Sequence, residues 1–463
     1  MNIIRRTYNH TGVVVTVPAR QVRVAIVAPD DPVILAGSWH CDMSWTDAFP
    51  YDPATQTTAP QKAVWMSWHR PLANSGASFT RNNLACYGGA LPRSAILTPY
   101  RYDAAGDAFD LDAWNPSFWL AFRAMAEWCN EIGQRLVVCI GNECEMRKAD
   151  RKAQSPWWHN AQGVDGMYAD DAIPYWRALT RKVLEVLDGL DFGIEPINEC
   201  NNRNGLDATR AILDELHAAG FPVERLTLGA MMLDCNFLGY DKPWPDQYDE
   251  ADGNFTNQVY IGKAVDSLWG AHQRNRAWYP IHGVLEPQEH PDQPFGRRWH
   301  QATDWWVRHI GNSVRLYLSS DGSEHGSGYN GRPAGERWAA AISAILAEGR
   351  RNIRIGTDAK FLFEAFQQGV PPAIFAAVLD RMAEAIMAAG YTLSNRGKFP
   401  EPVVVIPPTE PQPEPPPVVP PVTPPAPVVK HSAWYWLIPR FSRKWPWILI
   451  NFRRWWLTLT GKE

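Results

Sequence analysis

Apolar runs of strand length alternate with longer amphipathic segments over most of residues 1–398. The runs that we interpret as strands are 22–27, 33–37, 96–100, 135–141, 191–197, 225–229, 279–285, 314–318 and 352–355. The helices predicted between them are at about 116–132, 172–188, 206–219, 299–309, 334–348 and 371–389. Strands that alternate with helices pair in parallel, and about eight such units close into a barrel. We therefore predict an α/β fold, a (β/α)8 TIM barrel, for residues 1–398.

Proline sets the next segment apart. Residues 400–427 hold 14 of the 39 prolines. Because proline lacks a backbone donor and fixes its own φ, such a segment forms an extended polyproline-type chain and no helix or sheet. At about 3.1 Å per residue it would span roughly 80–90 Å. We interpret residues 399–429 as a linker, with a ligand for a proline-binding domain as the alternative.

Residues 430–463 form a short tail that is both basic and rich in tryptophan. Seven lysines and arginines face a single glutamate there, a net charge of +6 in a chain whose total is −4. This combination is typical of a segment that lies in a membrane interface. Two prolines and paired arginines interrupt it too often for a membrane span of about 20 apolar residues. The tail is expected to bind a membrane surface or a partner protein.

The composition of the chain limits the classes of partner that we expect. A formal charge of −4 gives no reason to expect nucleic acid, while 23 tryptophans supply indole faces that stack well on sugar rings. The seven cysteines form no CxxC pair, which argues for reduced thiols and against a disulfide scaffold or zinc site, and we expect no metal and no cofactor. The first residues lack the apolar stretch of a secretory signal. With the basic tail, this suggests a virion or cell-envelope setting, although the compartment stays unknown.

The strand predicted at 191–197 is followed directly by Asn198 and Glu199. In an α/β barrel, the chemistry lies at the carboxyl ends of the strands. An amide beside a carboxylic acid suits sugar chemistry, because the amide can hold a hydroxyl while the acid protonates a glycosidic oxygen. The alternative is a strand-end glutamate that caps the next helix.

Three segments resemble the cellulase-like members of the clan A glycoside hydrolases. They are Phe109-Asp-Leu-Asp-Ala-Trp-Asn-Pro-Ser-Phe-Trp119, Pro156-Trp-Trp-His-Asn-Ala-Gln-Gly163 and Ile194-Glu-Pro-Ile-Asn-Glu199. The first is similar to the segment before the third helix of that family, the second to its Pro-Trp loop after strand three, and the third to its fourth-strand signature. The resemblance covers residues 100–205 in detail. It implies that Glu199 is the general acid/base and that Asn198 holds a sugar hydroxyl.

A retaining glycosidase also needs a nucleophilic carboxylate about 5–5.5 Å from the acid/base. The family takes it from the end of the seventh strand, which here is 314–318. Asp321 is the first carboxylate past that strand, and Glu324 lies three residues further into a glycine-rich loop. We favour Asp321 over Glu324. A third possibility is that neither serves, because a carboxylate beside glycine can simply cap a turn.

The remaining candidates would line the substrate cleft. Asn142 ends the third strand, His282 and Glu286 belong to the sixth, and Trp157 and Trp158 would form a stacking subsite; Arg101 follows the predicted second strand, where the family keeps an arginine that holds the nucleophile ionised. Each also has a structural alternative: a packed strand histidine, a core tryptophan or a surface arginine.

Two function classes follow. The chain has no glycine-rich phosphate loop, no HExxH and no GxSxG, so phosphoryl transfer, zinc proteolysis and serine hydrolysis have no motif here. The first class is a retaining glycoside hydrolase acting on a β-linked polysaccharide, with Glu199 as acid/base and Asp321 or Glu324 as nucleophile. The second is a catalytically weak or inactive barrel that serves as a glycan-binding or structural module.

Overall fold

The computed structural model describes residues 33–41, 48–84, 97–142, 172–198, 205–228, 231–232, 253–282, 315–320, 332–347, 353–357 and 372–399. All of them belong to one compact unit, Met1–Pro402. The predicted linker beyond 399 and the tail 430–463 lie outside the described residues, as do the predicted strand 22–27 and the predicted helix 299–309.

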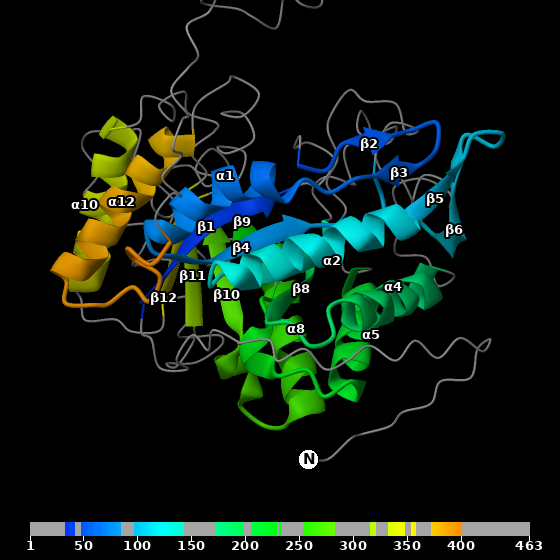
Figure 1. Cartoon of the computed structure of the whole chain (residues 1–463). Helices are drawn as coiled ribbons and strands as arrows, with labels where there is room; N and C mark the ends of the chain where they lie inside the picture. The colour runs from blue at the N-terminus through cyan, green and yellow to red at the C-terminus, as the bar shows by residue number, and fades with distance from the viewer. Residues whose placement is uncertain are drawn as a thin grey trace, which may run out of the picture. The chain divides into compact units, whose positions relative to one another are not determined.

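Eight parallel strands form the centre of this unit (Figure 1). They are β1 (Val33–Cys41), β4 (Ala77–Asn83), β7 (Arg135–Asn142), β8 (Phe192–Asn198), β9 (Met231–Met232), β10 (Trp278–His282), β11 (Arg315–Ser320) and β12 (Ile353–Thr357). Their order in the sheet is β8-β7-β4-β1-β12-β11-β10-β9, and all of the neighbouring pairs are parallel.

The sheet closes on itself between β8 and β10. Leu226 bridges to Ile194 of β8, and Thr227 bridges to Trp278 of β10. The backbone N–H of Thr227 donates to the Ile194 carbonyl at 2.8 Å, and that of Trp278 donates to the Leu226 carbonyl at 2.9 Å. Residues 226–228 therefore act as the first part of the fifth strand, which β9 continues. The strands form a closed parallel barrel, as the alternation of strand and helix predicts.

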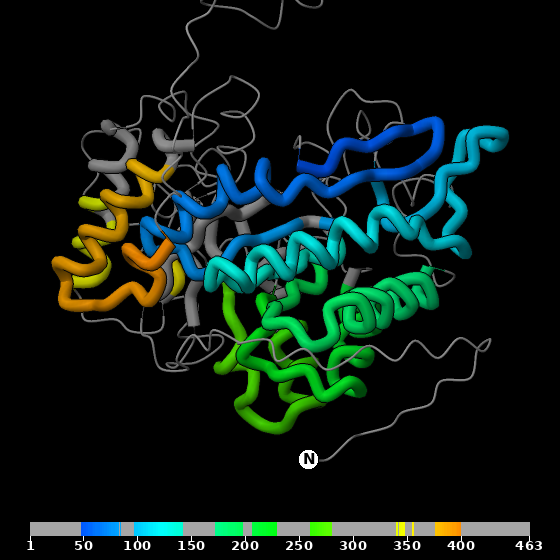
Figure 2. The backbone as a smooth tube through the Cα atoms, viewed as in Figure 1, coloured from blue at the N-terminus to red at the C-terminus, as the bar shows by residue number. Residues whose placement is uncertain are grey.

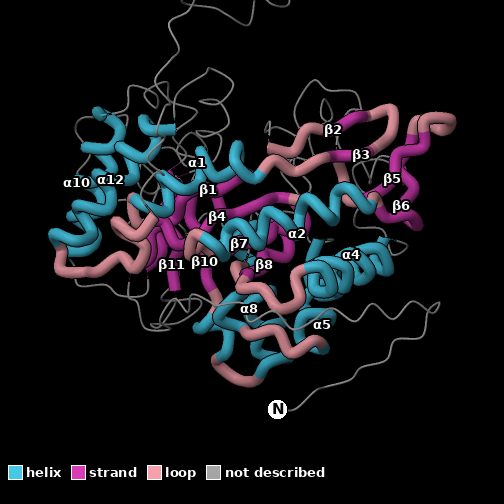
Figure 3. The backbone as a smooth tube through the Cα atoms, viewed as in Figure 1, coloured by secondary structure: helices cyan, strands magenta, loops and turns pink. Residues whose placement is uncertain are grey.

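Helices connect the strands and lie outside them (Figures 2 and 3). They are α1 (Lys62–Asn74), α2 (Pro116–Glu131), α4 (Ile173–Val186), α5 (Gly205–Ala218), α8 (Gly253–Trp269), α10 (Arg332–Ala347) and α12 (Pro372–Ala388). The main hydrophobic core lies between the two layers; it includes Leu136, Val138 and Ile140 of β7, which alternate along the strand with residues that face the interior.

Helix α2 shows why the sequence forms these elements. Asn115 caps it by accepting a hydrogen bond from the Ser117 backbone N–H at 3.1 Å, and Pro116 occupies its first turn, where no backbone donor is needed. Apolar side chains at helical spacing are buried along one face: Trp119, Phe122, Met125, Ala126 and Cys129. The helix predicted at 116–132 is confirmed.

The prediction of the second barrel strand at 96–100 is wrong. That strand is β4, and residues 97–99 instead lead into β5 (Tyr100–Asp103), which pairs antiparallel with β6 (Ala108–Trp114). The run is apolar because it packs as a loop: Leu97 and Tyr100 are buried, and the Trp119 indole donates to the Pro99 carbonyl at 3.1 Å. β4 escaped prediction because polar side chains occupy most of it.

Ion pairs and hydrogen bonds close the amino end of the barrel. Asp191 accepts from Arg135 Nε at 3.0 Å and lies 3.1 Å from Arg225 Nη2. The last described segment is fastened to the same end. Asn395 Nδ2 donates to the carbonyls of Ala77 and Gly133, both at 2.9 Å, just where β4 and β7 begin. The backbone N–H of Phe399 then donates to the side chain of Asn74, at the end of α1.

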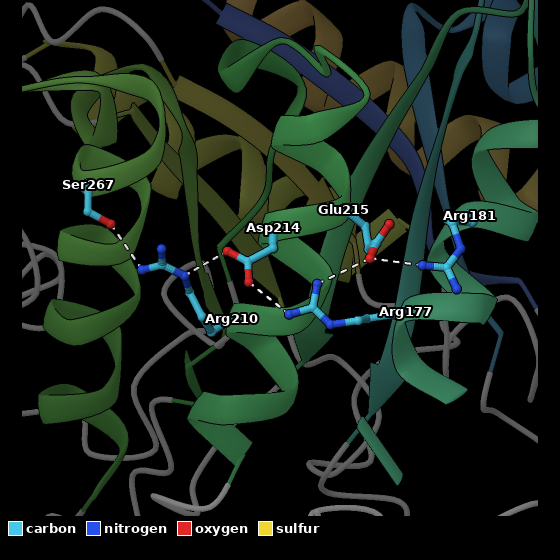
Figure 4. A network of polar contacts seen from close by, with 6 residues as sticks. All are labelled: Arg177, Arg181, Arg210, Asp214, Glu215 and Ser267. Carbon is cyan, nitrogen blue, oxygen red and sulfur yellow. Dashed lines mark hydrogen bonds and ion pairs between the residues drawn. The ribbon is translucent and has the colours of Figure 1, made fainter. Parts of the chain in front are cut away.

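A polar network ties three of the outer helices together (Figure 4). Arg177 of α4 pairs with Asp214 at 2.9 Å and with Glu215 at 3.1 Å, both on α5. Arg210 of α5 pairs with Asp214 at 2.8 Å and donates to Ser267 of α8 at 3.0 Å. The helices after strands three, four and five are thus joined side by side by polar contacts.

Within the described ranges, no helix is both long and apolar enough to cross a bilayer.

Candidate active site

The carboxyl ends of the strands gather several of the predicted site residues at one end of the barrel. Asn142 is the last residue of β7 and Asn198 the last of β8, and the two are register partners. His282 ends β10 and pairs in register with Met232 of β9. The structure therefore brings the backbones of Asn142 and Asn198 side by side, as the strand predictions require.

The predicted catalytic carboxylates lie just outside the described residues. Glu199 is the next residue after β8 in the sequence, and Asp321 is the next residue after β11. Trp157, Trp158, Glu286 and Glu324 also lie outside the described residues. Their roles stay predictions.

The same tripeptide begins at the last residue of each of the neighbouring strands β7 and β8. The sequence reads Asn-Glu-Cys at 142–144 and again at 198–200. Because Asn142 and Asn198 are register partners, both copies start from the same height in the sheet. Glu143 and Glu199, the next residues in the sequence, lie outside the described residues.

A buried ion pair lies inside the barrel below this edge. Arg81 Nε, on β4, donates to Glu195 Oε2, on β8, at 2.6 Å, and both side chains are fully buried. Since β7 separates the two strands, the side chains meet across it on the inner face of the sheet. Glu195 Oε1 has no hydrogen-bond partner among the described residues. Burial raises the pKa of Glu195 above its ordinary value, and the charge and hydrogen bond of Arg81 offset only part of that rise.

A second buried arginine crosses the interior. The guanidinium of Arg354, on β12, lies 3.8 Å from the ring centroid of Trp278 and 5.0 Å from that of Phe79. The side chain is 4% exposed. Aromatic faces attract a desolvated guanidinium, so Arg354 is held in place by these rings, and among the described residues it is a second buried arginine beside Arg81.

The placement of Arg101 after the second barrel strand is wrong. Arg101 lies in β5 of the small antiparallel sheet, is exposed, and has Asp110 of β6 as its register partner. The arginine that the second barrel strand carries is Arg81. Sequence reasoning missed both members of the buried pair, although a charged residue in the middle of the apolar run 191–197 was a signal for Glu195.

The described residues also bear on metal binding and on the thiols. Among them, no group of three or more His, Cys, Asp or Glu side chains could hold a metal ion. Cys129 and Cys139 are both buried, and the Cys139 thiol donates to the Gly141 carbonyl at 2.9 Å. These two thiols serve packing and local hydrogen bonding.

No protein-family model matches the sequence, and the comparison with curated proteins found no match. Among solved structures, the chain is similar to a GH5-4 broad-specificity endoglucanase from an uncultured bacterium, with 11% identity, a TM-score of 0.45, and coverage of 77% of this chain and 94% of that one. It is similar to a glycoside hydrolase family 5 enzyme from Prevotella bryantii in complex with a xyloglucan tetradecasaccharide, with 10% identity, a TM-score of 0.44, and coverage of 78% and 98%. An endo-1,4-beta-mannanase from Rhizomucor miehei follows with 10% identity, a TM-score of 0.40, and coverage of 68% and 84%.

Proposed function

We propose that this chain is a glycoside hydrolase that cleaves β-linked bonds in a polysaccharide. The observation that carries the proposal is the register pairing of Asn142 with Asn198 at the carboxyl ends of two neighbouring barrel strands. Glu199 follows Asn198 directly in the sequence. An acid at that end of a parallel strand, beside amides that can hold hydroxyls, is suited to protonating a glycosidic oxygen.

The proposed mechanism is retaining, with Glu199 as general acid/base. Asp321, the first residue past β11, attacks the anomeric carbon, and Glu324 is the alternative nucleophile. The bond to the leaving oxygen breaks as Glu199 gives it a proton. Glu199 then removes a proton from the water that hydrolyses the glycosyl-enzyme ester.

The other residues of the cleft have supporting roles in this proposal. Asn198, Asn142 and His282 bind sugar hydroxyls, while Trp157 and Trp158 stack on sugar faces. Glu286 stays a further polar candidate. Arg81, which the second barrel strand carries, pairs with Glu195, and its positive charge offsets part of the rise in pKa that burial causes for that carboxyl.

The deciding experiment is Glu199→Gln assayed on a panel of β-glucan, β-mannan and bacterial-envelope glycans. Removal of a general acid is expected to lower kcat/KM roughly 100- to 10,000-fold. Glu185→Gln on the outer face of α4, where the side chain is 70% exposed, is the matched control and should keep full activity. If the wild type hydrolyses no glycan in the panel, the enzyme proposal is wrong.

The second candidate is a glycan-binding or structural barrel with weak or no catalysis. What favours it is the residue that follows β11, because Asp321 is one methylene shorter than the glutamate usual in the family that the motifs resemble. A wild type that binds glycans and cleaves none would support it.

For residues 399–429 and 430–463 we propose a spacer and a basic aromatic segment that binds a membrane surface or a partner protein. Vesicle flotation of the full chain against a 1–398 truncation tests this role. Equal flotation of the two forms would rule out membrane binding.

A further inference from the structure

The barrel closes between β8, its fourth strand, and residues 226–228, the first part of its fifth; we call this junction the seam. Ile194 bridges to Leu226 there, and the Thr227 N–H donates to the Ile194 carbonyl at 2.8 Å. In a parallel pair, the next donor of β8 that points toward the fifth strand belongs to residue 196. That residue is Pro196, which has no N–H, so the ladder of backbone hydrogen bonds is interrupted at the seam.

Two polar side chains are neighbours at the seam, inside the barrel. Because Ile194 pairs with Leu226, the next pair along the two strands is Glu195 with Thr227. Ile194 and Leu226 belong to the main hydrophobic core outside the sheet. Successive side chains of a strand point to opposite faces, so Glu195 and Thr227 point to the interior. Adjacent strands lie about 4.8 Å apart, which brings these two side chains next to each other.

Both side chains are buried, and each has an oxygen that no described residue contacts by a hydrogen bond. Glu195 is 0% exposed and Thr227 is 2% exposed. Glu195 Oε2 accepts from Arg81 Nε at 2.6 Å, whereas Glu195 Oε1 and Thr227 Oγ1 have no hydrogen-bond partner among the described residues. Buried polar groups are rarely left in this state, and ordered water often supplies the partner. Two such oxygens at paired positions point to one shared ligand.

The chemistry of the seam selects a small neutral ligand. The charge of Arg81 already balances a Glu195 carboxylate, so a cation at Oε1 would meet a like charge nearby and an anion would meet the carboxylate. The Thr227 hydroxyl both donates and accepts. Burial raises the pKa of Glu195, and a ligand that can also donate and accept suits either form of the carboxyl. Water meets these demands with the two polar partners that a buried water needs at minimum.

We propose that one ordered water molecule binds inside the barrel between Glu195 Oε1 and Thr227 Oγ1 and joins the fourth strand to the fifth. It forms a hydrogen bond with each of the two oxygens. The link lies beside Pro196, where the backbone ladder is interrupted, and a water-mediated contact can be nearly as favourable as a direct hydrogen bond. This inference goes beyond the proposed function and does not depend on any catalytic activity of the chain.

The water is tested in the full chain by oxygen-17 relaxation dispersion, which counts long-lived internal water molecules. Thr227→Val keeps the shape of the side chain without the hydroxyl and is expected to hold one water fewer than the wild type. Thr227→Ser keeps the hydroxyl and should match the wild type. Thr180→Val is the matched control, because the buried Thr180 hydroxyl donates to the Trp176 carbonyl at 2.8 Å within α4; its count should not change.

The joining of the strands is tested by hydrogen exchange at the seam. The Leu228 N–H donates to the Trp278 carbonyl at 2.8 Å, and the Trp278 N–H donates to the Leu226 carbonyl at 2.9 Å. Both amides are expected to exchange roughly tenfold faster in Thr227→Val, because the fifth strand loses one link to β8. Thr227→Ser should keep the rates of the wild type, and the amides of β7 should exchange equally in all of the proteins.

Three results would overturn the proposal. Equal water counts in the wild type and Thr227→Val would show that no water depends on the Thr227 hydroxyl; with faster exchange in Thr227→Val, they would indicate a direct hydrogen bond from Thr227 to Glu195 instead. Unchanged exchange at Leu228 and Trp278 would show that the water does not join the strands. Equal acceleration in β7 would show a loss of stability of the whole barrel and no particular role at the seam.

Discussion

Arg81 and Glu195 form an ion pair with 2.6 Å between Nε and Oε2, and neither side chain is exposed to solvent. The pair joins the second and fourth barrel strands from inside, across β7. Each charge was removed from water at a large cost, which the other charge offsets only while both are present.

Removing one partner of this pair should be far more costly than removing both. Glu195→Gln is expected to lower the free energy of unfolding by about 3–5 kcal/mol, because the buried charge of Arg81 then loses the opposite charge of Glu195. Urea denaturation followed by circular dichroism measures the loss. The double variant Arg81→Met, Glu195→Leu is the control and should lose less than Glu195→Gln alone. A single variant that loses under about 1 kcal/mol would contradict this account of the pair.

His69 should make stability depend on pH. Its ring stacks on Trp65 with centroids 3.9 Å apart, and burial lowers its pKa from 6.5 to about 3, against a hydrogen bond with Gln134 that raises it. The unfolded chain therefore binds a proton that the folded chain excludes. The part of the unfolding free energy that depends on neutral His69 is fully present above pH 6.5. It is lost as the pH falls toward 3, by about 1.4 kcal/mol per pH unit.

His69→Phe keeps the ring stacked on Trp65 and removes the titration. Between pH 7 and pH 4, the wild type is expected to lose about 3 kcal/mol more than this variant. Urea denaturation at the two pH values gives the difference. Parallel losses in the two proteins would show that His69 does not carry the effect.

The network on the outer helices should respond to salt. Arg177→Met removes the arginine that joins α4 to Asp214 and Glu215 of α5. Because Arg177 and Asp214 are about a third exposed, the loss of stability is expected to be only about 1 kcal/mol and to shrink in 1 M NaCl, where charges are screened within about 3 Å. Lys182→Met, which breaks one pair within α4, is the matched control and should cost less. A salt-independent loss for Arg177→Met would point to packing.

The barrel should be complete at residue 399. A 1–399 truncation is expected to unfold at the same temperature as the full chain, because it keeps the bonds of Asn395 to Ala77 and Gly133 and that of Phe399 to Asn74. A 1–390 truncation loses all of them. The Gly133 carbonyl then loses its Asn395 donor, at a cost of about 1–3 kcal/mol, whereas the Ala77 carbonyl keeps a longer bond from Gln134 Nε2 at 3.4 Å. Differential scanning calorimetry compares the three forms. Equal melting temperatures for 1–390 and 1–399 would show that the fastening has no effect on stability.

Strands with aliphatic runs could be predicted from the sequence, and a strand with a polar face could not. β7 contains Leu136, Val137 and Val138, and this apolar run predicts a buried strand. β4 reads as a loop, because Arg81 and Asn82 are buried there by partners that are distant in sequence. The Arg81–Glu195 pair spans 114 positions, so no local pattern announces it.

The candidate site divides in the same way. The strand ends at Asn142 and Asn198 follow from local apolar patterns, and the structure has them at the ends of β7 and β8. The sequence predicts Arg101 as a site residue because it follows the predicted strand 96–100. The barrel does not contain that strand, so the placement of Arg101 is wrong for the same reason. The Gln56 side chain forms two hydrogen bonds with the backbone of Tyr102, 46 positions away, and no local periodicity in the sequence predicts such a contact.

The fastening of Asn395 and Phe399 at the amino end also has a practical consequence. Asn395 and Phe399 lie at the amino end of the barrel, opposite the carboxyl ends of the strands where Asn142 and Asn198 lie; these carboxyl ends are called the mouth. A resin, sensor chip or fluorescent label coupled just beyond Phe399 would therefore be attached away from that mouth. Immobilised protein of this kind should still admit long polymers from solution.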